Sequence, residues 1–120
     1  MDSKYKKLFE SINIGGCKIK NRFVMAPMGP MGLGDFEGGF SQRGIDYYVE
    51  RAKGGTGLIT TGVCLVDTEI EKMKMPSVPN PNYNPIHFIR QGKEMTERIH
   101  AYGSKVFIQL SGGFGRVIPT

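Results

Sequence analysis

The apolar positions of this chain follow two periods, one typical of strands and one typical of helices. Near the start, apolar and polar residues alternate on both sides of Gly15-Gly16, which predicts a short hairpin with a two-residue turn. The next run, over 22–26, is apolar almost throughout and leads into Pro27. Continuous apolarity of this kind predicts a strand that is covered on both faces.

Two longer segments carry the helical period. Ser41 can cap a helix over about 42–53, and Asn84-Pro85 can start a second helix that Gly103 ends. The apolar positions of the first helix recur at intervals of three and four residues and comprise Ile45, Tyr48, Val49 and Ala52. Those of the second helix comprise Phe88, Met95, Ile99 and Tyr102. Both helices are therefore predicted to cover a sheet with one face.

Each helix is followed by another apolar run, and these runs predict a second buried strand over 57–61 and a third apolar strand over 106–110. Residues 66–83 show neither period and contain three prolines, so we expect a long surface loop there. Strands that alternate with helices of this length are parallel and joined by right-handed crossovers. Three such strands leave exposed edges. We therefore expect residues 1–120 to be an incomplete α/β domain, either a doubly wound sheet or a barrel.

Composition narrows the class of protein. The 17 glycines and 7 prolines concentrate in 28–39, 76–85 and 111–119, as in a loop-rich enzyme. The net charge of +5 is spread along the chain and mixed with acidic residues, which argues against a nucleic-acid surface. The basic excess fits an anionic cofactor and a merely solvated surface equally well.

Cysteine usage and the N-terminus indicate a cytoplasmic protein. Cys17 and Cys64 have no CxxC spacing and no paired histidines, so neither a zinc site nor a disulfide framework is predicted. The first residues are charged and lead into no long apolar stretch. We therefore expect no secretory segment, no membrane span and no metal site in this chain.

Chemistry in a parallel α/β protein concentrates at the carboxyl ends of the strands. These ends are predicted at 26–30, 61–64 and 109–113, and each is rich in small residues, so that a planar ring could lie against backbone there. The Gln109 amide offers a donor and an acceptor, which suits the edge of a pyrimidine-like ring. From the residues alone, a hydrogen bond from Gln109 to neighbouring backbone is favoured over a bond to a ligand. Pro27-Met28 could likewise be plain loop packing rather than part of a binding site.

Other candidates carry weaker signals. The glycine-rich stretch 112–116 resembles a phosphate-binding loop but lacks the lysine and hydroxyl of a P-loop, and Arg116 is interpreted as a brace for that loop. His87 and His100 are too far apart for a metal pair on one helix, and we expect surface or packing roles for them. Cys64 is interpreted as a small buried filler at a strand end.

Three stretches together resemble one family. They are IKNRFVMAPM at 19–28, DYYVERAKGGTGLI at 46–59 and KVFIQL at 105–110, and their order and spacing are similar to the start of the old yellow enzyme family of flavin oxidoreductases. The likeness covers nearly the whole chain. Within the family, Met28-Gly29-Pro30 and the stretch 112–117 are most similar to the anaerobic 2-enoate and cinnamate reductases.

The resemblance implies FMN at the mouth of a (β/α)8 TIM barrel, with residues 1–20 as a hairpin cap beneath. Pro27, Met28 and Gly29 would touch the isoalloxazine after the first barrel strand. The Val63 backbone would pass near the ring, and Gln109 would form hydrogen bonds with the pyrimidine edge. For Gln109 the resemblance thus reverses the preference for a bond to neighbouring backbone. Two departures are visible: many members have Thr or Cys in place of Gly29, and many have a histidine in the loop after Gln109.

The resemblance also implies an activity, the transfer of hydride from reduced flavin to the activated double bond of an unsaturated carboxylate, with NADH as ultimate donor. No family position for the proton donor or the substrate-binding groups falls within 1–120, so we expect no catalytic residue here and an inactive isolated segment. A 4Fe–4S cluster, FAD and NADH domains, and homo-oligomerisation, are expected of a longer protein. A dienoyl-CoA reductase or amine dehydrogenase on the same scaffold, and a non-catalytic anion-binding module, stay open as alternatives.

Overall fold

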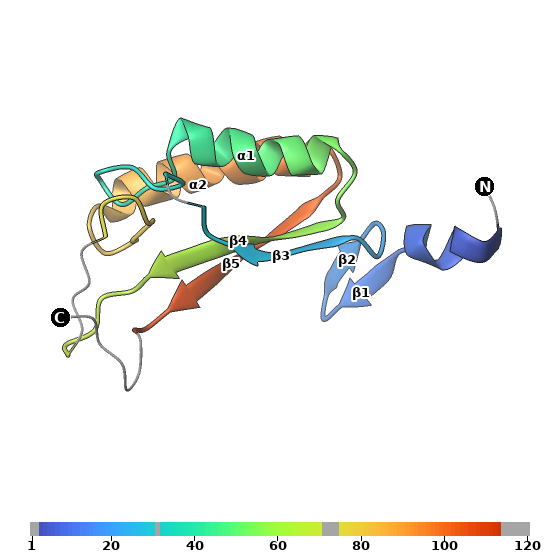
Figure 1. Ribbon diagram of the computed structural model, residues 1–120, viewed down its shortest axis with the longest axis horizontal. Coiled ribbons are helices and arrows are strands. Elements are labelled where there is room, and N and C mark those ends of the chain that lie inside the picture. The colour runs from blue at the N-terminus through green and yellow to red at the C-terminus, as the bar shows by residue number, and fades with distance from the viewer. Residues whose placement is uncertain (1–2, 31, 71–74, 114–120) are drawn as a thin grey trace.

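The computed structural model describes residues 3–30, 32–70 and 75–113. Its elements lie along the chain in the order η1 (Ser3–Phe9, a 3-10 helix), β1 (Ile12–Ile14), β2 (Cys17–Ile19), β3 (Val24–Met28), α1 (Gln42–Lys53), β4 (Leu58–Leu65), α2 (Pro85–His100) and β5 (Lys105–Ser111). Figure 1 shows η1 and the β1–β2 hairpin beyond one end of a layer of strands that two helices cover. The 3-10 helix η1 was not predicted from the sequence.

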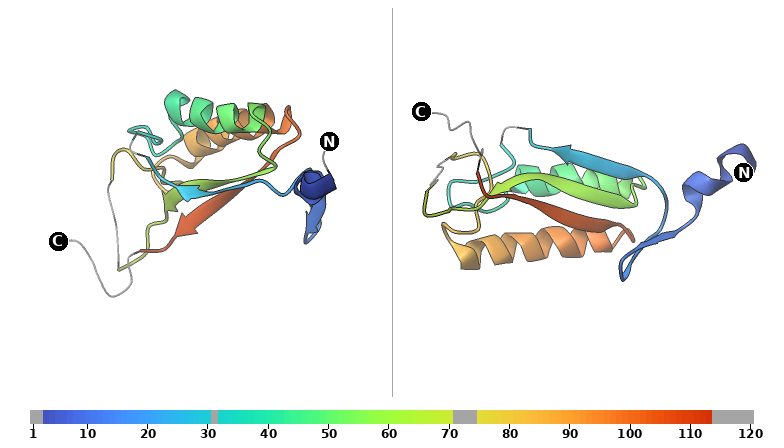
Figure 2. Two further views of the ribbon diagram at one scale, coloured as in Figure 1. Left: turned by 45° about the vertical axis from the view of Figure 1, so that its right-hand side comes forward. Right: turned by 90° about the horizontal axis from the view of Figure 1, so that it is seen from below.

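The main sheet has the strand order β3-β4-β5, and both neighbouring pairs are parallel. Both helices lie on the same face of this sheet, and in the described part of the chain nothing covers the opposite face (Figure 2). The predicted hairpin is confirmed: β1 and β2 pair antiparallel, and Gly15 at the turn has a φ of 58°. The predicted alternation of parallel strands and helices is confirmed as well.

The core lies between α1, α2 and the covered face of the sheet. On α1 the four predicted apolar residues are all buried, and on α2 Met95 and Ile99 are buried. Tyr102 was predicted to extend the apolar face of α2 but lies beyond the helix end and is 45% exposed. The apolar spacing therefore identified both helices correctly but extended the apolar face of α2 beyond the end of that helix.

Both helices begin where the sequence places their caps. The Ser41 side chain accepts a hydrogen bond from the Gly44 N–H, and the Asn84 side chain accepts one from the His87 N–H. After α2 the chain turns at Gly103, which has a φ of 76° that favours glycine. None of the helices in the described ranges is long and apolar enough to cross a membrane.

Two expectations for the strands were wrong. The first strand was expected over 22–26 with both faces covered, but β3 is shifted to Val24–Met28 and of its residues Met25 alone is buried. Val24 is 55% exposed and Met28 is 52% exposed, because no described element covers the second face of the sheet at this edge. The second strand was expected to end at Thr61 but continues to Leu65.

The segment between β4 and α2 is anchored rather than lying freely on the surface. It has no helix or strand in its described residues, as predicted, yet Asn80 is 2% exposed. The Asn80 amide donates to the Asp67 carboxylate at 2.9 Å, and the Leu65 N–H donates to the Pro79 carbonyl at 2.8 Å. These bonds join residues that are far apart in the sequence, and one of them links two backbone groups, so no local sequence pattern reveals them.

Candidate functional site

The carboxyl ends of β3, β4 and β5 lie side by side, and they bring the five predicted cofactor positions together. Met28 of β3 is in register with Thr61 of β4, and Val63 of β4 is in register with Gln109 of β5. Pro27 and Gly29 flank Met28 in the chain. The predicted residues therefore form one contiguous row across three strands, which we call the strand-end wall (Pro27, Met28, Gly29, Val63, Gln109).

Both strand pairs are irregular just before this wall. From Met25 to Met28 the chain takes three steps on β3 against two on β4, and from Thr60 to Val63 it takes three steps on β4 against two on β5. An extra residue of this kind is a β-bulge, which bends a strand and redirects its side chains. Pro27 lies in the first irregular stretch, where a residue without an N–H disturbs no regular ladder bond.

Gly62 lets the two bulges approach closely. A Cβ atom at Gly62 would lie 2.5 Å from the Met28 carbonyl oxygen and 2.6 Å from Gly29 Cα, which is closer than atoms can pack. Gly62 is therefore required by backbone contact between β3 and β4 rather than by its own conformation. At Gly29 the situation differs, because an added Cβ would lie 3.9 Å from its nearest neighbours.

Two side chains bridge the second bulge. The buried Tyr48 hydroxyl accepts a hydrogen bond from the Gly62 N–H at 2.8 Å, and the buried Thr61 Oγ1 accepts one from the Gln109 N–H at 3.3 Å. Both bonds take the place of regular ladder bonds at this point of the sheet. The apolar spacing of α1 predicted a core position for Tyr48, and nothing in the sequence indicated that its hydroxyl reaches a strand end.

The side chain of Gln109 is exposed, and its amide has no hydrogen-bond partner within the part of the chain that the structure describes. The bond to neighbouring backbone that the residues alone favoured is therefore not formed. Pro27, Met28 and Gly29 are exposed as well, and Val63 is half-buried. The strand-end wall thus presents backbone, the exposed Met28 side chain and one free amide, a combination that fits the face and edge of a flat heteroaromatic ring.

The described loop residues at this end of the sheet pack behind the wall. A cavity of about 30 Å³ lies among Gly29, Tyr48, Gly62, Val63 and the buried Pro79. That volume is about the share of one water molecule. The wall is consequently supported from behind by closely packed side chains and backbone.

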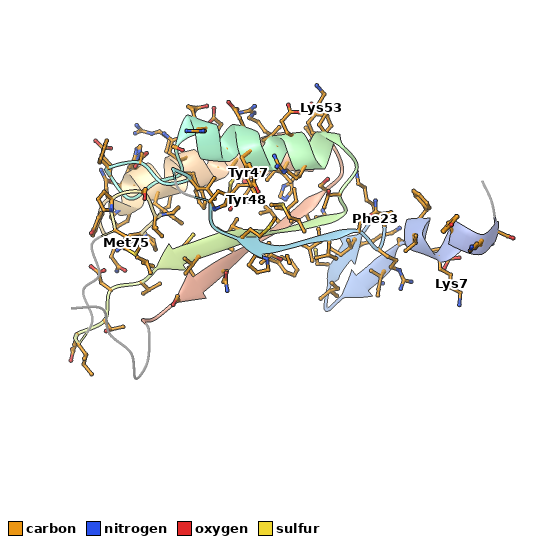
Figure 3. The ribbon with its side chains drawn as sticks, viewed as in Figure 1. Lys7, Phe23, Tyr47, Tyr48, Lys53 and Met75 are labelled. Atoms are coloured by element: carbon orange, nitrogen blue, oxygen red, sulfur yellow. The ribbon has the colours of Figure 1, made fainter. Side chains whose placement is uncertain are left out.

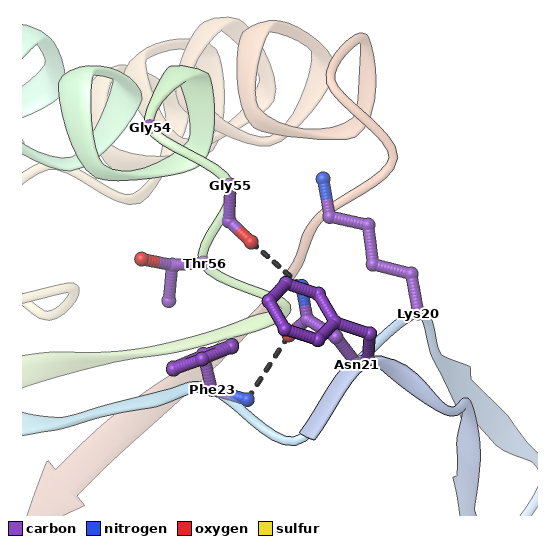
Figure 4. Close-up of a pocket in the computed structure, with 7 residues that line it drawn as sticks. Lys20, Asn21, Phe23, Gly54, Gly55 and Thr56 are labelled. Atoms are coloured by element: carbon purple, nitrogen blue, oxygen red, sulfur yellow. Dashed lines mark hydrogen bonds between the residues drawn. The ribbon is translucent and has the colours of Figure 1, made fainter. Parts of the chain in front are cut away.

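A larger hollow of about 600 Å³ lies at the opposite end of the sheet, where β3 and β4 begin (Figure 4). Its lining residues are Phe9, Lys20, Asn21, Phe23, Gly54, Gly55 and Thr56. The Asn21 amide donates to the Gly55 carbonyl at 2.7 Å and accepts from the Phe23 N–H at 3.0 Å, so it is already bonded within the chain. These contacts tie the end of the hairpin to the start of the sheet, and we interpret this end as structural.

The other titratable candidates take packing roles. Burial raises the pKa of the Cys64 thiol to about 11, which leaves it protonated and confirms the filler interpretation. His87 Nε2 lies 2.6 Å from Asp35 Oδ2 and ties α2 to the loop after β3.

Among the described residues, no group of three histidine, cysteine or acidic side chains could hold a metal ion. Arg116 and most of the glycine-rich stretch 112–116 lie outside the described residues.

Sequence comparisons place the whole chain among flavin oxidoreductases. Residues 7–117 match the model of the NADH:flavin oxidoreductase / NADH oxidase family. The chain is 60% identical to the cinnamate reductase of Clostridium sporogenes over 121 aligned positions, which is 100% of this chain and 18% of that protein. It is 37% identical to the NADH oxidase of Thermoanaerobacter brockii, over 88% of this chain and 16% of that protein.

The fold agrees with this grouping. The old yellow enzyme homologue from Zymomonas mobilis matches 94% of this chain and 30% of its own with a TM-score of 0.73 and 26% identity. The three strands and two helices are therefore the N-terminal part of a TIM barrel, and the doubly wound alternative is set aside. The chain belongs to the NADH:flavin oxidoreductase / NADH oxidase family, whose members are flavin-dependent enzymes.

Proposed function

We propose that this chain is the N-terminal part of an FMN-dependent ene-reductase of the 2-enoate or cinnamate type. The observation that carries the proposal is the 60% identity to a cinnamate reductase across 100% of the chain. The chain spans 18% of that relative, so the activity, substrate and partners are proposed for a longer protein. A cytoplasmic location and assembly into a homo-oligomer belong to the same proposal.

The strand-end wall fits the proposed cofactor. Gln109 would bond the pyrimidine edge of FMN, since its free amide provides a donor and an acceptor side by side. The backbone at Val63 would face the ring, and Pro27, Met28 and Gly29 would contact it from the neighbouring strand. Bound FMN would supply the hydride for reduction of the activated double bond.

This chain's own contribution is to bind and orient the cofactor. Glycine and proline at the wall keep the surface flat, and the two bulges hold it in place with bonds that do not depend on a ligand. We propose that the proton donor and the groups that bind the substrate carboxylate lie outside residues 1–120. The 4Fe–4S cluster and the FAD and NADH sites of the proposed enzyme would lie there too.

The test uses the full-length protein, purified without oxygen. We expect a bound flavin visible in its absorption spectrum, released as FMN on denaturation, and oxidation of NADH that depends on cinnamate. Gln109→Leu should weaken FMN binding about tenfold or more, because two hydrogen bonds to the ring edge are lost. Gln91→Leu on α2 is the matched control and should bind FMN as the wild type does. A protein without flavin would contradict the proposal.

A second candidate is an NADH oxidase, which the 37% identity to the Thermoanaerobacter brockii protein favours. Such an enzyme would consume NADH in the presence of oxygen without any alkene. Parallel assays with oxygen alone and with cinnamate alone distinguish the two. A rate that depends on cinnamate under nitrogen supports the ene-reductase.

A further inference from the structure

Tyr48 brings a buried hydroxyl from α1 to the irregular part of β4. Its side chain is fully buried and lies between α1 and the sheet (Figure 3). Its oxygen accepts the Gly62 N–H at 2.8 Å. Burial is the main cause that raises the pKa of Tyr48 above 10.0, so the group stays a neutral phenol in physiological conditions. Proton transfer is thus not the role of Tyr48. What matters is the position in which its hydroxyl oxygen is held.

The bulge explains why Gly62 needs this acceptor. The extra residue of a bulge falls out of the regular ladder, and Gly62 is buried, so its N–H is shielded from bulk solvent. A buried donor without an acceptor costs free energy. Without the tyrosine oxygen, the β4 backbone at this point would turn to find another partner.

Gly62 is also the contact point of the strand-end wall. It precedes Val63 in the chain and lies against Met28 and Gly29, which leave no room for even a Cβ atom. A rotation of the Gly62 peptide would therefore displace Val63 and push on the end of β3. Three of the five proposed cofactor positions depend on this one peptide.

We propose that Tyr48 is a positioning residue for the flavin site: by accepting the Gly62 N–H, its hydroxyl fixes the β4 bulge and thereby the backbone surface that Val63 and Gly29 present to the cofactor. The proposal rests on the function proposed above. Because the Tyr48 side chain is fully buried, it would act on the cofactor through Gly62.

The neighbouring tyrosine provides a matched control. Tyr47 lies on the same helix, its ring is packed under the Arg51 guanidinium at 3.7 Å from the centroid, and no hydrogen bond of its hydroxyl occurs among the described residues. Tyr48→Phe and Tyr47→Phe each remove one oxygen and keep the ring. A difference between these variants in the full-length protein therefore reports the bond to Gly62 rather than the loss of an aromatic side chain.

Two measurements test the proposal. The first is FMN binding to flavin-free protein, followed by fluorescence titration. The second is hydrogen exchange of the peptide over 58–65 in the flavin-free protein. We expect Tyr48→Phe to raise the dissociation constant of FMN about tenfold and to speed exchange within 58–65, and we expect Tyr47→Phe to do neither. The absorption maxima of the bound flavin should shift in Tyr48→Phe alone.

Other outcomes overturn the proposal. Unchanged FMN binding in Tyr48→Phe, with a lower melting temperature, would make the tyrosine merely structural. Equal effects in both variants would do the same. A wild-type protein that binds no flavin contradicts the proposed function, while the exchange comparison still decides whether Tyr48 anchors β4. If Tyr48→Phe does not fold, exchange of the Gly62 amide in the wild type decides, and rapid exchange there overturns the proposal.

Discussion

Glycine is used at the strand ends for two different reasons, and these can be separated experimentally. At Gly62 an added Cβ meets backbone at 2.5 Å, whereas at Gly29 it would lie 3.9 Å from its neighbours. The requirement at Gly62 is thus steric, and Gly29 leaves space at the wall. A methyl group added at Gly29 would therefore fit here without displacing β4.

We predict that Gly62→Ala destabilises the full-length protein and that Gly29→Ala does not. Overpacking at a rigid backbone contact costs about 1–3 kcal/mol, so the melting temperature of Gly62→Ala should fall by several degrees. Differential scanning calorimetry of both variants measures the difference. Equal melting temperatures would show that β3 and β4 can separate at this point without cost.

Among the elements, the start of α1 is held by one serine in two directions. The Ser41 hydroxyl accepts the Gly44 N–H at 3.0 Å and donates to the Gly32 carbonyl at 2.7 Å, so it caps the helix and fastens the preceding loop. We predict that Ser41→Ala lowers the free energy of unfolding by about 1–2 kcal/mol. Denaturant titration measures this loss. Ser41→Asp, which can still cap the helix, should recover part of the stability.

The loop after β3 and the start of α2 are joined by the Asp35–His87 pair. Burial by itself raises the pKa of Asp35, but hydrogen bonds from His87 and from the Gly39 and Glu37 N–H groups outweigh it, and the net pKa lies below the ordinary 3.8. A carboxyl whose pKa is lower in the folded chain than in the unfolded chain stabilises the fold above pH 3.8. That contribution is lost as the pH falls through the lowered pKa.

We therefore predict that Asp35→Asn lowers the melting temperature at pH 7 and that its difference from the wild type shrinks as the pH falls below 3.8. Thermal unfolding of both proteins over this range tests the prediction. Asp46→Asn is the control, because the Asp46–Arg98 pair is exposed and such surface pairs contribute little. A difference for Asp35→Asn that persists unchanged into acid would contradict the assignment.

At the scale of the whole molecule, one face of the sheet and the outer sides of both of its edge strands lack a covering element in the described part of the chain. The edge strands expose large apolar side chains, namely Val24, Met28, Phe107, Ile108 and Leu110. Exposed apolar surface together with open strand edges favours association. In the TIM barrel to which this part belongs, further strands close the sheet and its open face becomes the barrel interior.

We predict that residues 1–120 produced alone self-associate and bind FMN at least about a hundredfold more weakly than the full-length protein, because a single wall encloses little of a flavin. Size-exclusion chromatography with light scattering and a fluorescence titration test both parts. A monomeric segment that binds FMN as the full-length protein does would contradict the prediction.

Most elements, and the strand ends that hold the proposed site residues, could be predicted from the sequence. The cap signals of Ser41 and Asn84 and the apolar spacing of α1 are local, and so the helices were placed correctly. The placement of Met28, Val63 and Gln109 at strand ends followed from strand boundaries and from the family resemblance together. The exposed face of β3 was mispredicted as buried. An apolar residue reflects the contacts that it makes in the complete fold, and some of those contacts lie outside this segment.

The amino-acid sequence by itself thus determined the order of strands and helices, the helix caps and the family. Each of these is encoded in short stretches of neighbouring residues. Tertiary structure alone decided the two bulges, the contact of Gly62 with Met28 and Gly29, and the bond from Tyr48 to Gly62. Each of these joins residues from different elements, and a close approach or a satisfied buried N–H is a property of three-dimensional packing that no local pattern records.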